Sequence, residues 1–216
     1  MLEKMGDFFN NRKDGYEDHQ LNCIEGANEF LQFSAEQLPT EPNTKVLDLG
    51  CGTGLELDYY FKINPTANVT GIDLAAGMLD ILKQKFTGKN LRLICGSYFD
   101  LPFEENFYDA AISVESLHHF TAAEKTPLYT KLYKSLKKGG YFVLTDYFAP
   151  TDEYEQNLRN EYIKLKADQG IKDDEFYHFD TPLTVAHEID CLKEAGFKNI
   201  KEIKNWEATH TIIATK

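Results

Sequence analysis

At residues 46–54 the chain reads Val46-Leu47-Asp48-Leu49-Gly50-Cys51-Gly52-Thr53-Gly54. The apolar run at 45–50 is typical of a buried strand, and a helix-like stretch follows at 55–63. Between them, glycine occupies every second position. A plain strand-to-helix turn needs one glycine, whereas three let the backbone turn sharply and leave room for a ligand to approach it. The segment therefore predicts a ligand-binding loop at the carboxyl end of a buried strand.

The spacing of this loop limits the kind of ligand. A dinucleotide fingerprint, G-x-G-x-x-G, would place its third glycine where the chain has Leu55. A phosphate loop would end in Gly-Lys-Ser/Thr, which this loop does not contain. Asp48, two residues before Gly50, would repel a pyrophosphate and can receive an ammonium group instead. The loop therefore favours a zwitterionic, cationic ligand over a phosphorylated one.

Strand and helix patterns alternate along the middle of the chain. After the glycine loop we expect four further strands, at 68–73, 91–95, 108–114 and 141–146. Thr126 and Pro127 suggest the start of the helix before the last of these strands, and Gly139-Gly140 its end. Such alternation predicts an α/β fold with a parallel sheet covered by helices on both faces.

The two ends of the chain are less regular. Residues 1–15 are polar apart from Phe8-Phe9, and we expect the first helix to follow them and to end at Pro39. Towards the C-terminus we expect a helix through 158–165, a helix opened by Thr181-Pro182 and closed by Gly196, and antiparallel strands at about 200–204 and 208–215. We expect one domain, 1–216, in which 1–40 and 147–181 are additions packed over one sheet.

The composition restricts the class of protein. Hydrophobic residues make up 42% and aromatic residues 13% of the 216 residues, so the chain can form a core and is not disordered. Lys plus Arg (23) and Asp plus Glu (35) give a formal net charge of −12, which disfavours nucleic acid and membrane surfaces as partners. The chain shows neither a Cys-x-x-Cys pair nor a signal-peptide pattern, so we expect reduced thiols and a cytoplasmic protein.

Three further segments accompany the glycine loop: Val69-Thr70-Gly71-Ile72-Asp73, Gly96-Ser97-Tyr98-Phe99-Asp100-Leu101-Pro102-Phe103, and residues 108–120. Together these segments resemble the class I S-adenosylmethionine-dependent methyltransferases, in the small-molecule branch grouped as methyltransferase type 11 domains. The resemblance covers about residues 40–146 strongly and the rest weakly. It implies a Rossmann-like, seven-stranded, mostly parallel sheet with an antiparallel last strand pair. It also implies S-adenosyl-L-methionine as cofactor and methyl transfer to a small-molecule acceptor, by a monomer or homodimer.

The resemblance gives the matched positions roles. Asp73 would bind the ribose hydroxyls, although an aspartate here could instead cap the following helix. Ser97 stands where the family has an aspartate, so its hydroxyl or the Tyr98 backbone N–H would contact the adenine edge. Val114 and Glu115 would line the methionine end of the cofactor. The complete set of expected cofactor contacts is Tyr16, His19, Asp48, Gly50, Cys51, Gly52, Gly54, Asp73, Leu74, Met78, Ser97, Tyr98, Val114 and Glu115.

Fewer groups are available for the chemistry itself. Methyl transfer from a sulfonium needs mainly alignment and a dry site, and a general base is optional. We expect His118 to be the base where one is used, with Tyr16 and His19 as reserves. Because His118 and His119 are adjacent, we expect their rings to point apart, and we therefore expect no metal site.

Two questions stay open at the level of sequence. The aromatic residues of 147–181, an acceptor-side insertion, can be the packing of a helical lid or an aromatic wall for a partly apolar acceptor and the sulfonium. Residues 1–40 are expected to form lid helices. The chain could also bind S-adenosylmethionine without transfer, as a sensing or partner-activating module, or methylate RNA, which its charge disfavours.

Overall fold

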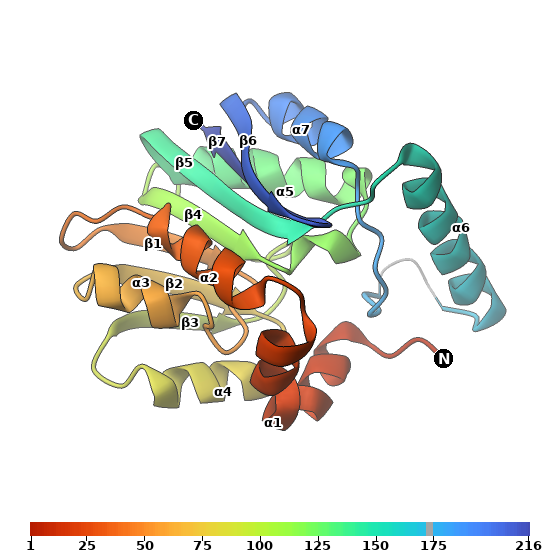
Figure 1. Cartoon of the computed structure of the whole chain (residues 1–216), viewed down its shortest axis with the longest axis horizontal. Helices are drawn as coiled ribbons and strands as arrows, with labels where there is room; N and C mark the ends of the chain where they lie inside the picture. Colours follow the sequence, from red (N-terminus) through yellow and green to blue (C-terminus); the bar gives the residue numbers. More distant parts are fainter. Residues whose placement is uncertain (172–174) are drawn as a thin grey trace.

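The computed structural model describes residues 1–171 and 175–216, so a short part of the 147–181 segment lies outside the described residues. A seven-stranded sheet with helices on both faces forms the molecule (Figure 1). Its strands are β1 (Lys45–Leu49), β2 (Asn68–Asp73), β3 (Asn90–Cys95), β4 (Tyr108–Val114), β5 (Leu136–Tyr147), β6 (Lys198–Trp206) and β7 (Thr209–Thr215). The helices are α1 (Met5–Cys23), α2 (Ala27–Glu36), α3 (Leu57–Ile63), α4 (Ala76–Lys85), α5 (Ala122–Ser135), α6 (Asp152–Asp168) and α7 (Val185–Glu194), with a 3₁₀ turn, η1 (Leu117–His119).

The strand order is β3-β2-β1-β4-β5-β7-β6. The first five strands pair in parallel, whereas β7 pairs antiparallel with both β5 and β6. The predicted α/β sheet with an antiparallel last pair is therefore confirmed. The order reverses between β1 and β4, and ligands of open α/β sheets bind at such a point, outside the carboxyl ends of the strands. The glycine loop follows β1 and Glu115 follows β4, so both lie there.

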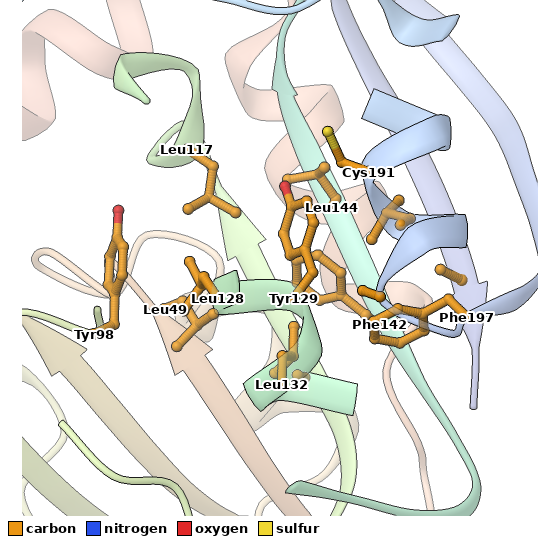
Figure 2. Packing of buried hydrophobic residues seen from close by; sticks show 14 of the residues in the cluster. Leu49, Tyr98, Leu117, Leu128, Tyr129, Leu132, Phe142, Leu144, Cys191 and Phe197 are labelled. Atoms are coloured by element: carbon orange, nitrogen blue, oxygen red, sulfur yellow. The ribbon is translucent and has the colours of Figure 1, made fainter. Parts of the chain in front are cut away.

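Alternate residues of the central strands pack on opposite faces of the sheet. On one face, Leu47 and Leu49 of β1 join side chains of α5 and α7 in the main core cluster, part of which Figure 2 shows. On the other face, Val46 joins side chains of α2, α3 and α4. Because side chains alternate along a strand, Asp48 shares this second face with Val46, and it is 1% exposed. The sheet thus carries a carboxyl group into the core next to the glycine loop.

The first helix begins earlier than the sequence predicts. α1 already starts at Met5, and α2 is a separate helix, so the prediction of one helix after residue 15 is wrong. Met5 is the one buried residue of α1 in the described structure, so no apolar period marks this helix in the sequence. Between the helices, Gly26 has a φ of +73°, and a Cβ there would lie 3.1 Å from Trp206. The chain turns at Gly26, where a side chain would press on the indole.

The bounds predicted for α5 are wrong at both ends. The helix begins at Ala122 rather than at Thr126-Pro127, because Thr121 and Glu124 form a capping box in which Thr121 N donates to Glu124 Oε2 at 2.7 Å. The helix ends at Ser135 and β5 follows at once. Gly139, with a φ of +78°, belongs to an irregular start of β5, where the register with β4 shifts, and not to the helix end.

α7 likewise begins at Val185, later than the predicted start at Thr181-Pro182. Its cap is Thr184, whose hydroxyl accepts a hydrogen bond from His187 N at 3.3 Å. Thr181 N donates instead to the His118 carbonyl at 2.8 Å. The segment before α7 is therefore fixed alongside η1, at the carboxyl end of β4.

Candidate active site

The three glycines of the loop have positive φ values and serve different purposes. A Cβ at Gly50 would lie 1.9 Å from Ser116 Oγ, so the loops after β1 and β4 can meet only over a bare backbone. A Cβ at Gly54 would lie 2.9 Å from the Phe86 ring, so this glycine serves core packing. A Cβ at Gly52 would meet no described atom closer than Tyr16, at 3.9 Å. Gly52 is therefore the glycine whose bare backbone faces open space.

Asp73, at the end of β2, ties the neighbouring loops together. Its Oδ2 accepts a hydrogen bond from Gly52 N at 2.9 Å, and its Oδ1 accepts one from Ala75 N at 2.8 Å. The N-cap residue of α4 is Ala75, two residues after Asp73, so the alternative in which Asp73 is the N-cap residue of this helix is wrong. Burial raises the pKa of Asp73, against the effect of the two backbone hydrogen bonds. The remaining lone pairs of this carboxyl group can accept hydrogen bonds from a diol.

Two buried carboxyl groups lie beside the loop. Asp48 is 1% exposed and Glu56, the N-cap residue of α3, is 6% exposed. Burial raises the pKa of both groups, and the neighbouring Glu56 raises that of Asp48 further. In the described part of the chain, Asp48 Oδ2, Glu56 Oε1 and Thr53 Oγ1 are buried without a hydrogen-bond partner. An ammonium group fits these oxygens, because it would donate hydrogen bonds to them and balance their charge. Sequence reasoning identifies Asp48 but misses Glu56.

Three cavities meet at the carboxyl ends of the strands. One of about 40 Å³ is bordered by Asp73 and Met78, and one of about 20 Å³ by Glu56. A third cavity, of about 700 Å³, is bordered by His118. Small-molecule sites usually measure roughly 300–1,000 Å³, so the third cavity is large enough for a ligand and the first two are not.

The cavities join at two side chains. Tyr16 of α1 and Glu115, directly after β4, border all three of them. Glu115 has a φ of +50°, uncommon for a residue with a side chain, and its Oε1 accepts a hydrogen bond from Thr209 Oγ1 at 3.2 Å. Burial raises the pKa of Glu115 to about 7, and the carboxylate of Asp146 contributes. Strained backbone of this kind is concentrated at functional sites.

α1 covers the two small cavities. The α1 side chains that border the 40 Å³ cavity are Met5, Phe9 and Tyr16. The helix is fastened by polar contacts: Asn10 Oδ1 accepts a hydrogen bond from Gly77 N at 2.8 Å, and Glu17 pairs with Lys85 at 2.7 Å. A nucleoside-sized ligand can enter the small cavities only when these α1 side chains move.

Most of the predicted cofactor contacts border the two small cavities. They are Tyr16, Gly50, Cys51, Gly52, Gly54, Asp73, Leu74, Met78, Tyr98, Val114 and Glu115. His19 borders the large cavity instead. Ser97 borders none of the three, and its hydroxyl accepts a hydrogen bond from Phe99 N at 3.1 Å. Tyr98 turns its hydroxyl to Ser116 Oγ, at 3.2 Å. The contact that each residue makes with the cofactor stays a prediction.

His118 forms a dyad with Asp146, a residue that sequence reasoning missed. Its Nδ1 lies 2.5 Å from Asp146 Oδ1, and Asp146 Oδ2 accepts a hydrogen bond from Leu117 N at 2.8 Å. Burial opposes the charge of His118, but the Asp146 carboxylate outweighs it and raises the pKa to about 9. At neutral pH the free protein therefore holds His118 as an imidazolium, which cannot accept a proton.

The expectation that adjacent histidines point apart is wrong. The ring centroids of His118 and His119 are 4.0 Å apart, because η1 turns both side chains to the same side. Burial and the charge of His118 lower the pKa of His119 to about 4. Asp180, from the segment before α7, lies 3.0 Å from His119 Nδ1 and 3.6 Å from His118 Nε2.

The aromatic residues of 147–181 divide between the two predicted roles. Tyr147 borders the large cavity, and its hydroxyl lies 2.9 Å from that of Tyr154. Phe176 packs instead against Phe99, with 5.3 Å between ring centroids. This segment also meets the N-terminus, since Met5 N donates to the Phe176 carbonyl at 3.0 Å.

Fold and site together define the class of protein. A seven-stranded sheet with an antiparallel last pair, a glycine loop after β1 and an acidic residue at the end of β2 are the frame of a class I S-adenosylmethionine-dependent methyltransferase. Residues 47–144 match the model of the methyltransferase domain family. The predictions of a methyltransferase enzyme and of S-adenosylmethionine as its cofactor are thereby confirmed.

Named relatives extend the match beyond this domain. The carboxy-S-adenosyl-L-methionine synthase of Campylobacter lari is 24% identical over 100% of this chain and 96% of its own length. The malonyl-[acyl-carrier protein] O-methyltransferase of Priestia megaterium is 35% identical over 58% of this chain, and the match spans 44% of that enzyme. The solved structure of human N-acetylserotonin methyltransferase with S-adenosylmethionine has a TM-score of 0.64 at 19% identity, covering 97% of this chain and 55% of that one. The structural likeness supports the fold.

Proposed function

We propose that this chain transfers the methyl group of S-adenosylmethionine to a small molecule bound in the 700 Å³ cavity. The observation that carries the proposal is that Tyr16 and Glu115 border both small cavities and the large cavity. A sulfonium placed at this junction would face an acceptor in the large cavity. The cofactor supplies a methyl group already activated by its sulfonium, so the protein contributes alignment and exclusion of water.

Each end of the cofactor has suitable residues. Asp73 would accept hydrogen bonds from the ribose hydroxyls, and Met78 and Tyr98 would pack around the adenine. Asp48 and Glu56 would receive the ammonium group through their unsatisfied oxygens. Because His118 is protonated in the free protein, we assign it no role as a general base there, and an acceptor can lose its proton to solvent.

The walls of the large cavity favour a partly apolar acceptor. Phe8, Phe9 and Tyr147 supply aromatic surface, while the histidines supply polar groups at one end. Arg12 also borders this cavity, but its guanidinium already pairs with Glu3 through bonds of 2.9 and 3.0 Å. An acceptor with an apolar body and one oxygen or nitrogen nucleophile matches these walls.

The net charge of −12 supports a small-molecule substrate over a nucleic acid, and we infer a monomer or homodimer that acts in the cytoplasm. Among the described residues, no helix combines the length and apolar character that crossing a membrane requires. Residues 1–40 and 147–181 would together form the lid of the site.

A second candidate is the reaction named for the Campylobacter lari relative, whose match spans nearly the whole of both chains. That protein is a synthase whose named product, carboxy-S-adenosyl-L-methionine, is itself a cofactor derivative. The two candidates share the cofactor and differ in the product. Mass spectrometry of the cofactor after turnover therefore separates them.

The test incubates the purified chain with S-adenosylmethionine and carboxylic acids, phenols and amines as separate acceptors. Methyl transfer predicts equal amounts of S-adenosylhomocysteine and methylated acceptor for at least one class. A carboxylated cofactor without S-adenosylhomocysteine, formed with one of the carboxylic acids as the carboxyl donor, would support the synthase reaction instead. Cofactor that binds but is unchanged with every class would contradict methyl transfer to these acceptors. Gly52→Val serves as the inactive control.

A further inference from the structure

Three metal-ligating side chains from separated parts of the chain meet beside the large cavity. His118 and His119 come from η1, and Asp180 comes from the segment before α7. The hydrogen bond of Thr181 N to the His118 carbonyl, at 2.8 Å, fixes that segment against η1. One ligand atom from each of the three side chains lies within 4.8 Å of the others.

The spacing of these atoms suits a single ion. Bonds of about 2.0–2.2 Å in a tetrahedral arrangement place neighbouring ligand atoms roughly 3.4 Å apart. Asp180 Oδ1 lies 3.6 Å from His118 Nε2 and 3.0 Å from His119 Nδ1, on either side of that value. His119 Nδ1 also lies 3.3 Å from the Phe179 carbonyl oxygen. In the metal-free protein, a proton on this nitrogen would make that contact a long hydrogen bond.

The residues around these three side chains orient them and place negative charge near them, as in metal sites. Asp146 Oδ1 holds His118 Nδ1 at 2.5 Å, which leaves Nε2 to face Asp180, and such carboxylate–histidine pairs orient the histidines of metal sites. Asp180 Oδ1 is a buried atom that lies 3.0 Å from His119 Nδ1, and its interaction with the two histidines lowers the pKa of Asp180. Glu115, His118 and Asp146 also place ligand atoms within 4.8 Å of one another, so three carboxyl groups surround this pair of histidines. A dication would displace the proton that His118 carries in the free protein and balance the charge of these carboxyl groups in its place.

We propose that His118, His119 and Asp180 bind a divalent transition-metal ion at the end of the large cavity. Two imidazoles and one carboxylate leave coordination positions open, and all three residues border the cavity. An acceptor oxygen or nitrogen could occupy an open position, where the ion would hold it and lower its pKa. This use of the ion rests on the proposed methyl transfer, whereas the binding of the ion does not.

The test is calorimetric titration of Zn²⁺ into the untagged, chelator-treated full chain at neutral pH. Cys23 and Cys95 carry exposed thiols, so Cys23→Ser and Cys95→Ser are introduced in the reference protein and in every variant. We expect about one equivalent of Zn²⁺ to bind the reference. Asp180→Asn should weaken binding at least tenfold, and it alters a side chain that is 47% exposed, so the fold should persist.

His187→Gln is the matched control, because His187 also contacts a carboxylate, Glu155 at 2.8 Å, but lies outside the cluster. It should bind Zn²⁺ as the reference does. Stoichiometry well below one, or equal affinity in Asp180→Asn and the reference, would overturn the metal site. Binding of S-adenosylhomocysteine and turnover are measured on the same samples, so a failure of methyl transfer is seen separately from a failure to bind Zn²⁺.

Discussion

Gly50 and Ser116 are in such close contact that a single added methyl group at Gly50 would lie 1.9 Å from the Ser116 hydroxyl oxygen. The contact joins the loop after β1 to the loop after β4, at the point where the strand order reverses. The distance between the two halves of the cofactor site is therefore set by a residue without a side chain.

Gly50→Ala should destabilise the protein strongly. At a φ of +75° the alanine is strained by about 1–3 kcal/mol, and the overlap with Ser116 should cost a further ~1–3 kcal/mol. Gly88→Ala is the control, because Gly88 has a φ of +86° and no described atom lies within 4 Å of the position that an alanine methyl group would take there. Chemical denaturation measures both variants, and equal losses would contradict the close contact.

Gly52→Val should remain folded and lose S-adenosylhomocysteine binding. The nearest described atom to a Cβ at Gly52 is 3.9 Å away, so no described atom blocks the first carbon of the side chain, although a φ of +47° strains a β-branched residue. The side chain would occupy the space that the ligand needs. Circular dichroism checks the fold and calorimetry the affinity. A folded variant with near-normal affinity would show that the ligand lies elsewhere.

Binding of S-adenosylhomocysteine should release protons at a pH between the ordinary pKa of a carboxyl group and the raised pKa values of Asp48 and Glu56. Burial raises the pKa of both groups, and an incoming ammonium group would lower it again and so displace protons. The stability of the free protein should fall as pH rises from the ordinary carboxyl pKa to these raised values, because over that range the folded state binds more protons than the unfolded chain. Calorimetry in buffers of different ionisation enthalpy measures the release, which Asp48→Asn should reduce. A heat of binding that is independent of the buffer would contradict this assignment.

Amide hydrogens of residues 1–20 should exchange quickly in the free protein and become protected when S-adenosylhomocysteine binds. α1 buries one residue fully in the described structure, and its other contacts are polar or made by partly buried side chains, so its local opening needs little free energy. Hydrogen exchange with mass spectrometry follows this region, with β4 as the internal reference. Exchange rates over 1–20 that are the same with and without the ligand would contradict the proposed lid.

The parts that the sequence predicts well are those with short-range signals. The strands at 68–73 and 108–114 appear with the predicted bounds, because apolar runs between turns mark them. The glycine loop and Asp73 are likewise a local pattern at strand ends. Glu56 could have been found, since a carboxyl group two residues past Gly54 begins the helix that follows the loop.

Other features depend on contacts that no local pattern encodes. α1 buries only Met5 fully in the described structure, and it is stabilised in part by Gly77, far along the chain. The meeting of His118 and His119 with Asp180 needs both the 3₁₀ turn of η1 and a segment about sixty residues later, as the contact of His119 with Phe179 shows. Adjacent residues point apart on a strand, and the prediction failed because these two lie on a turn.

The central claim is that the reacting sulfur lies at the junction of Tyr16 and Glu115, facing the 700 Å³ cavity. The most direct test is a crystal structure of the full chain with S-adenosylhomocysteine. We expect the ribose hydroxyls to lie on Asp73, the amino group beside Glu56 and the sulfur open to the cavity that His118 borders. A sulfur atom walled off from that cavity, or a ligand bound away from Gly52, would contradict it.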